Sequence, residues 1–113
     1  MPVARKGDSV ELLTDELRQA LPSLYTQEGE KDPMVYAKFF TPDSSWTWYV
    51  TEGSPENCSF VFFGYVVGHE REWGYFTLEG LGSVRGPLGL PIERDLHFTP
   101  RRFSQTDAAR DLA

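Results

Sequence analysis

The stretch KFFTPDSSWTWYVTE, residues 38–52, decides the fold of this chain because it joins two strand-like runs through a turn. The runs extend over about 35–40 and 46–52, and both are rich in the aromatic and β-branched residues that strands favour. Between them, Pro42 fixes its backbone φ angle, and the Asp43 side chain can bond the local backbone. So short a connection joins antiparallel strands, and the stretch therefore predicts a β-hairpin.

Two further strand-like runs follow, over about 60–68 and 73–78. A loop at 53–59 precedes the first run, and a charged tip separates the two. Thr77 can cap one helical turn after the second run. A Pro/Gly-rich loop then leads to a short last strand at about 95–98, which can close the sheet edge. These spacings predict a four- to five-stranded antiparallel β-meander.

The N-terminal part of the chain predicts one short helix. In LLTDELRQALPSLY, residues 12–25, Thr14 can cap the helix and Pro22 ends its pattern. Four leucines at helical spacing form one apolar stripe: Leu13, Leu17, Leu21 and Leu24. We therefore expect an α+β fold in which this N-terminal helix packs on the sheet. We expect a single domain over 1–113, with an ordered core at about 9–100 and a tail at 101–113 that is a frayed helix or disordered.

Composition is typical of a cytoplasmic protein. No apolar run approaches the roughly 20 residues that a membrane span needs. The basic N-terminus has no apolar segment behind it that would make a secretory signal. The chain has one cysteine, Cys58, which excludes an internal disulfide framework. We expect a reduced, cytoplasmic protein with no membrane contact.

The charges are unevenly distributed along the chain, whose net charge is −6. Residues 43–79 carry six acidic residues against Arg71 alone, whereas residues 85–102 carry four arginines against two acidic residues. Phosphate contacts need clustered cations, so the net charge argues against general nucleic-acid binding. The pattern indicates either a solvated acidic surface or an acidic face for a basic partner.

Most aromatic side chains of the hairpin are expected in the core. Strand alternation places Trp46, Trp48 and Val50 on one face and Tyr49 on the other. The run at 60–68 is apolar on both faces, which indicates a central strand. One helix cannot cover both faces of the sheet, so an apolar surface is left over, as at many interfaces. We expect Trp48 in the core and Trp46, beside the turn, either in the core or at an exposed edge.

The sequence contains no visible catalytic constellation. Its two histidines lie at a hairpin tip and on a short strand, and Cys58 lies in a loop without the nearby cation that would lower its pKa. No serine has the context of a nucleophile elbow, and no glycine-rich segment carries the Lys-Ser or Lys-Thr of a phosphate loop. We therefore expect no enzyme, no cofactor and no metal site. A small pocket around Asp43, Arg94 and Asp95 is the one place left for an activity.

The segment RGPLGLPIERD, residues 85–95, is the best local candidate for a binding site, because a Pro/Gly-rich loop ends there in adjacent charges. On one interpretation, Arg85 or Arg94 bridges carboxylates and pins the loop to the sheet. On the other, both arginines join Asp43 and Trp46 in one recognition surface, since the two loops can lie at the same end of the meander.

Several stretches carry a resemblance to a known family: KFFTPDSSWTWYVTE, GYFTLEGL and SVRGPLGLPIERDLHF, preceded by LLTDELRQALPSLY. Together they resemble the bacterial family called domain of unknown function 2958, in register over roughly residues 12–98. The resemblance implies a small cytoplasmic protein often encoded on plasmids, conjugative elements and prophages, sometimes near anti-restriction genes. It carries over no catalytic residues. The segment 53–59 departs from the family pattern as a longer connecting loop.

We predict a small non-catalytic interaction module of a mobile element, which binds a host or element-encoded protein, with a defence-related role as one option. The alternative is a single-stranded nucleic-acid binder that stacks bases on aromatic side chains and engages phosphates with arginines. Its platform would be Trp46, Trp48 or Tyr49. Its arginines would be Arg85, Arg94, Arg101 and Arg102.

One geometric criterion separates the two predictions. A nucleic-acid site needs rings and arginines on the same exposed face, whereas a protein site tolerates an apolar face bordered by acids. The sequence assigns neither the partner nor the oligomeric state. The candidate binding residues are Asp43, Trp46, Trp48, Arg85, Arg94 and Asp95.

Overall fold

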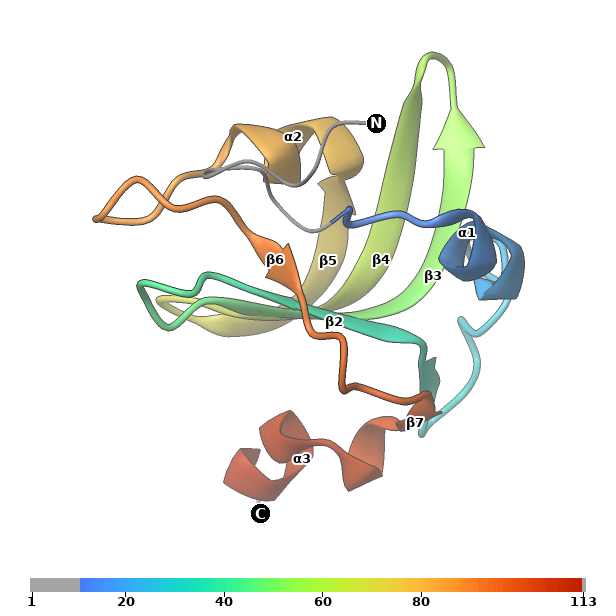
Figure 1. Ribbon diagram of the computed structural model, residues 1–113. Coiled ribbons are helices and arrows are strands. Elements are labelled where there is room, and N and C mark those ends of the chain that lie inside the picture. Colours follow the sequence, from blue (N-terminus) through green and yellow to red (C-terminus); the bar gives the residue numbers. More distant parts are fainter. Residues whose placement is uncertain (1–10, 113) are drawn as a thin grey trace.

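The computed structural model describes residues 11–112 and shows an α+β fold with a five-stranded antiparallel sheet and a few short helices (Figure 1). The strands are β1 (Met34–Val35), β2 (Ala37–Phe40), β3 (Thr47–Glu56), β4 (Ser59–Val67), β5 (Arg71–Thr77), β6 (Glu93–Arg94) and β7 (Arg101–Arg102). The helices are α1 (Asp15–Ala20), α2 (Leu78–Ser83) and α3 (Asp107–Leu112), with a turn of 3-10 helix at Phe103–Gln105. The strand order is β5-β4-β3-β2-β6, and β1 pairs with β7 in a separate two-stranded sheet.

The central hairpin is confirmed. β2 pairs with β3 in antiparallel register, with Phe39 opposite Trp48 and Lys38 opposite Tyr49. Thr41 closes the turn, because its backbone N–H donates to the Trp46 carbonyl at 3.1 Å and its hydroxyl accepts the Trp46 N–H at 3.0 Å. The predicted strand at 35–40 is divided at Tyr36 into two short strands. β1 pairs with β7 in the separate sheet, and β2 pairs with β3 in the main sheet.

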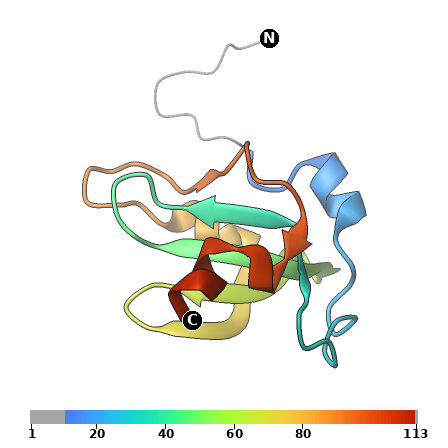
Figure 2. The same cartoon turned by 90° about the horizontal axis from the view of Figure 1, so that it is seen from below.

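The two faces of the sheet carry two separate buried clusters, as the alternation of the strands predicts. Trp48, Val50 and Phe62 belong to the first cluster, whereas Tyr49 and Tyr65 belong to the second. α2 and α3 lie on opposite sides of the sheet (Figures 1 and 2). No helix among the described residues is long and apolar enough to span a membrane.

The first cluster also contains apolar side chains from the short N-terminal and middle helices. Leu17 and Leu21, from α1 and its C-terminal cap, are buried in it together with Leu81 of α2. Thr14 caps α1 by accepting the Leu17 N–H at 3.1 Å, and Thr77 caps α2 by accepting the Gly80 N–H at 2.9 Å. Both predicted caps are therefore present.

The sequence predicts a loop over 53–59, but most of this segment is strand. β3 continues to Glu56 and β4 begins at Ser59, so only Asn57 and Cys58 form the turn. Asn57 has a φ angle of 53°, in the left-handed region that Asn tolerates better than most residues. A tight two-residue turn with a residue of positive φ suits the twist of an antiparallel pair, which explains why the strands run on.

The last strand of the five-stranded sheet, β6, lies at Glu93–Arg94 rather than at the predicted 95–98. It pairs with β2, with Phe39 opposite Arg94. After it, the Asp95 N–H donates to the Lys38 carbonyl at 2.8 Å, and the Asp95 carboxylate accepts the His97 N–H at 2.9 Å. The carboxylate therefore turns the chain away from the sheet edge, and 95–98 cannot continue the strand.

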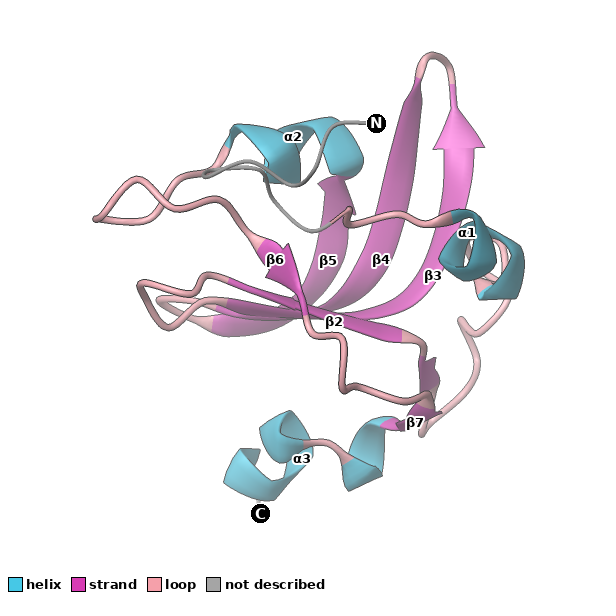
Figure 3. Cartoon of the chain, in the orientation of Figure 1, coloured by secondary structure: helices cyan, strands magenta, loops and turns pink. Residues whose placement is uncertain are grey.

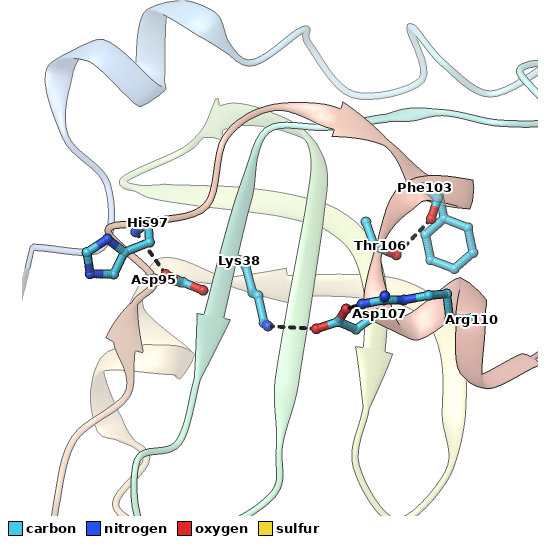
Figure 4. A network of polar contacts seen from close by, with 7 residues as sticks. All are labelled: Lys38, Asp95, His97, Phe103, Thr106, Asp107 and Arg110. Carbon is cyan, nitrogen blue, oxygen red and sulfur yellow. Dashed lines mark hydrogen bonds and ion pairs between the residues drawn. The ribbon is translucent and has the colours of Figure 1, made fainter.

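The sequence predicts a frayed or disordered tail over 101–113, whereas the structure shows β7, the 3-10 turn and α3 packed against the sheet. Asp32 holds this segment by accepting hydrogen bonds from the Ser104 N–H at 2.9 Å and the Ser104 hydroxyl at 2.7 Å. Lys38 of β2 lies 3.9 Å from the Asp107 carboxylate, and Asp107 also pairs with Arg110 (Figure 4). These contacts join residues far apart in sequence, so composition alone could not indicate them.

Candidate functional site

The sequence-predicted residues gather around Trp46, which is half-buried at the end of the β2–β3 hairpin. Its ring stacks on Trp48 at 5.8 Å between centroids and meets His69 edge-on at 5.4 Å. A β-carbon on Gly68 would overlap the ring, so backbone packs closely on another side of it. Trp48 is buried, as predicted. Trp46 is thus largely engaged with its own chain.

Two grooves flank Trp46. One, of about 500 Å³, is lined by Trp46 together with Arg94, Asp95, Lys38 and others from β2 and β6. The second, of about 360 Å³, is lined by Trp46, Trp48, Arg85 and the start of the Pro/Gly-rich loop. The structure therefore brings the predicted residues to one end of the sheet, but divides them between the two sides of Trp46.

Asp43 holds the Pro/Gly-rich loop between α2 and β6, which Figure 3 shows as loop throughout most of its length. One carboxylate oxygen accepts the backbone N–H groups of Leu88 at 2.8 Å and Leu90 at 3.4 Å. A β-carbon on Gly86 would overlap the carboxylate, so only glycine lets the loop approach this closely. The loop is therefore clamped by an acid from the hairpin turn.

The two arginines of this region do not bridge carboxylates in the described part of the chain. Arg85 donates to the carbonyls of Gly82 at 2.9 Å and Val84 at 2.8 Å, at the end of α2. Arg94 donates through Nε to the Glu11 carbonyl at 3.0 Å. Arg85 thus closes the C-terminal end of α2, and Arg94 fastens the segment before α1 to the sheet edge.

A second site, which is not among the sequence-predicted residues, lies beside the edge strand β5. Three large aromatic side chains are exposed there: Tyr25 (59%), Trp73 (39%) and Tyr75 (56%). With half-buried Phe63 they line a pocket of about 300 Å³ between β5 and the loop at 25–33. We call this the aromatic pocket. The signal for it was the second apolar face of the run at 60–68, together with the aromatic residues of WGYF.

Glu52 forms part of the aromatic pocket and fixes its loop. It is 4% exposed, and its two carboxylate oxygens accept the N–H groups of Tyr25 at 2.8 Å and Gln27 at 2.6 Å. The Gln27 amide extends the attachment by donating to the carbonyls of Met34 and Thr51, both at 3.0 Å. The loop is therefore built onto the sheet by side chains, because it has no strand pairing of its own.

A β-bulge explains why Glu52 reaches this face. The β3–β4 register shifts between Val50 and Glu52, so that Glu52 lies opposite Phe63 instead of following Val50 into the first cluster. A bulge inserts one extra residue and reverses the alternation beyond it. The acidic side chain is thereby placed on the same face as Phe63 and Tyr75, which pair across β4 and β5.

Electrostatics in the aromatic pocket are acidic. Glu28, Glu30 and Glu52 line it against one cation, Lys31. The pKa of Tyr75 is raised above its ordinary value of 10.0 by partial desolvation first, then by a hydrogen bond with Tyr25, and further by the negative charges of Glu52 and Glu28. The negative charges of Glu52 and Glu28 therefore reach the exposed Tyr75 side chain.

The described residues contain no cluster of metal-binding side chains. No group of three or more His, Cys, Asp or Glu side chains in residues 11–112 is placed to hold a metal ion. Cys58 is exposed at the β3–β4 turn, and His69 lies at the β4–β5 tip, where it contacts Trp46.

Comparison with known proteins gives one match. No curated protein and no solved structure matches the chain. A sequence model of the family described as "Protein of unknown function (DUF2958)" matches residues 12–110, which is nearly the whole chain. The protein is therefore a member of the DUF2958 family.

Proposed function

We propose that this chain is a small non-catalytic module that binds another protein through the aromatic pocket. The observation that carries this proposal is the set of three exposed aromatic side chains, Tyr25, Trp73 and Tyr75, around a pocket with a net acidic lining. Aromatic residues with a polar border are typical of the anchoring centre of a protein interface. Edge strand β5 beside the pocket adds a row of backbone groups on which a partner segment can pair.

The proposed partner is a protein of the host or of the mobile element that encodes this chain, met in the cytoplasm of a bacterium. The resemblance to the family supports this setting, and a defence-related role fits the same setting. In this proposal, α1 and the Pro/Gly-rich loop stabilise the fold and do not contact the partner. Leu17 and Leu21 belong to the first cluster, and Asp43 ties the loop to the hairpin turn, so both elements stabilise the sheet away from the pocket.

Single-stranded nucleic acid is the second candidate partner, favoured by one observation: Trp46 and Arg85 line the same groove. Against it, Arg85 and Arg94 donate to backbone carbonyls, and the Trp46 ring packs on Trp48 and His69. The exposed rings at the aromatic pocket lie among glutamates, which repel phosphates. These contacts weigh against a base-stacking platform with free cations on either side.

The test compares three immobilised proteins in a bacterial host lysate: wild type, the double variant Trp73→Ala/Tyr75→Ala, and Trp46→Ala. We expect wild type and Trp46→Ala to retain the same protein, and the double variant to lose it while remaining folded by circular dichroism. Fluorescence anisotropy with labelled single-stranded DNA and RNA, across a salt series, provides the second arm. If retention of the lysate protein depended on Trp46 alone, the protein-binding site would lie beside Trp46 instead of at the aromatic pocket. Salt-sensitive binding of an oligonucleotide would favour nucleic acid as the partner.

A further inference from the structure

We propose that the aromatic pocket receives a basic side chain, Arg or Lys, from the partner protein. This inference rests on the proposed function and adds the chemistry of the partner residue. Four features of the pocket support it: the aromatic side chains of its walls, its net negative charge, the buried carboxylate of Glu52 and its volume.

The walls present aromatic faces at several angles. Phe63 lies 4.9 Å from Tyr75 with its ring tilted by 59°, and it stacks on Trp73 at 6.0 Å. Tyr25 meets Tyr75 edge-on at 6.3 Å, from the opposite, loop side of the pocket. Aromatic faces attract a cation placed within about 6 Å of their centroids, and Trp does so most strongly. Exposed rings from both a strand and a loop therefore form a surface suited to a cation.

Tyr25 is held in an unusual backbone conformation to complete this wall. Its φ angle is 74°, in the left-handed region that residues with a β-carbon rarely adopt. The hydrogen bond from its N–H to Glu52 keeps it there. A strained residue at a concave surface is a pointer to binding, because the rest of the fold must maintain it.

The charge of the pocket selects the sign of the ligand. Glu28, Glu30 and Glu52 line it against Lys31 alone, an excess of two negative charges. Partial desolvation is the largest cause of the raised pKa of Tyr75 and its hydrogen bond with Tyr25 is the next, while the charges of Glu52 and Glu28 add smaller contributions of the same sign. A phosphate or a carboxylate would be repelled here, whereas an ammonium or guanidinium group would be attracted.

Glu52 supplies a fixed, buried carboxylate at the pocket. Each of its oxygens accepts one backbone N–H, which leaves acceptor capacity on both. Among the described residues, no Lys or Arg forms an ion pair with it. A buried carboxylate without a cation is costly, and a basic side chain from the partner would compensate its charge.

The size of the pocket suits one side chain. Its volume of about 300 Å³ lies at the small end of the range for ligand sites. An extended Arg or Lys side chain can place its methylene stem against the rings and its charged head toward the glutamates. The pocket therefore fits an anchoring residue of a polypeptide.

The test uses single-residue probes and ¹⁵N-labelled wild-type protein. N-acetyl-arginine N-methylamide and its lysine counterpart are titrated while the indole N–H resonance of Trp73 is followed by NMR. The citrulline counterpart is the matched neutral control, because it has nearly the shape of arginine without its charge. We expect both cationic probes to shift the Trp73 resonance with saturation, and the citrulline probe to bind at least about tenfold more weakly.

Variants that remove a negative or a positive charge from the pocket should change the affinity for the arginine probe in opposite directions. Glu28→Gln should weaken binding of the arginine probe about two- to fivefold, and Lys31→Gln should strengthen it by a similar factor. Glu79→Gln on α2, outside the pocket, should leave it unchanged. Glu52 is kept intact, because its removal would also release the loop.

The inference is overturned if citrulline and arginine probes bind equally, if no probe shifts Trp73, or if Glu28→Gln and Lys31→Gln fail to change binding in opposite directions. Retention of a lysate protein through Trp73 and Tyr75, combined with such a result, would leave the protein-binding function standing and remove only the basic anchor. Loss of both would remove the function as well.

Discussion

At the scale of single residues, Glu52 shows most clearly what the sequence pattern could and could not predict. Strict alternation along β3 would continue from Trp48 and Val50 to Glu52 on the same core-facing side. The bulge instead places the carboxylate opposite Phe63, where it binds the loop at 25–33. A bulge has no reliable sequence signature, so the aromatic pocket could not be assembled from periodicity alone.

At the same scale, Phe62 of the central strand β4 lies in the core. It is fully buried and packs on Phe39 at 5.6 Å, Phe60 at 5.1 Å and Phe76 at 5.6 Å. Phe62→Ala should lower the free energy of unfolding by about 3–5 kcal/mol, because it empties an aromatic core position. Urea denaturation measures this, with Phe62→Leu as a milder control at about 1 kcal/mol. An unchanged midpoint for Phe62→Ala would exclude β4 from the centre of the stable core.

At the scale of elements, the Pro/Gly-rich loop depends on an acid outside it. Asp43→Ala removes both hydrogen bonds to the loop and should cost about 1–2 kcal/mol. Trypsin should then cleave after Arg85, at the start of the loop, faster than in wild type. Arg94→Ala is the matched control, because Arg94 binds the segment before α1 and should leave this cleavage unchanged. Equal acceleration in both variants would mean that Arg94 also holds the loop.

The C-terminal segment is attached through Asp32, and this attachment should depend on pH. Hydrogen bonds from the Ser104 hydroxyl and N–H lower the pKa of Asp32 below 3.8, and the charge of Arg102 acts in the same direction. A lowered folded-state pKa means that the stabilisation is present above 3.8 and is lost as pH falls through the folded-state pKa. Amide hydrogen exchange at Ser104 should therefore lose protection in that acidic range.

The matched variant for this pH dependence is Asp32→Asn, in which the side chain no longer titrates. Its protection at Ser104 should be weaker near neutral pH and insensitive to acid over the same range, because the charge-assisted bonds are absent. A wild-type acid response that persists in Asp32→Asn would assign the effect to another carboxylate.

At the scale of the whole molecule, the fold class and the order of the central strands were predictable because each is encoded locally. Alternating apolar runs and short connections specify a meander, and Thr14 and Thr77 specify two helix starts. The attachment of the C-terminal segment was not predictable, since it depends on a contact 72 residues apart between Asp32 and Ser104. The two candidate sites differ in the same way between local and long-range contacts. Trp46 lies in an aromatic-rich stretch that is evident in the sequence, whereas the aromatic pocket combines Tyr25, Glu52 and Tyr75 from three separated segments.

The central claim is that a protein partner contacts the aromatic pocket rather than the grooves around Trp46. Photo-crosslinking from two matched positions tests it most directly. A β-carbon placed on Gly29, between the pocket glutamates, would meet no atom of a non-adjacent residue within 4 Å, and Ser45 is exposed in the groove beside Trp46. p-Benzoylphenylalanine at each position, irradiated in host lysate, would report which surface is covered. We predict a discrete protein adduct from position 29, reduced by excess arginine amide, and none from position 45. An adduct from position 45 alone, or an adduct that nuclease removes, would contradict the account.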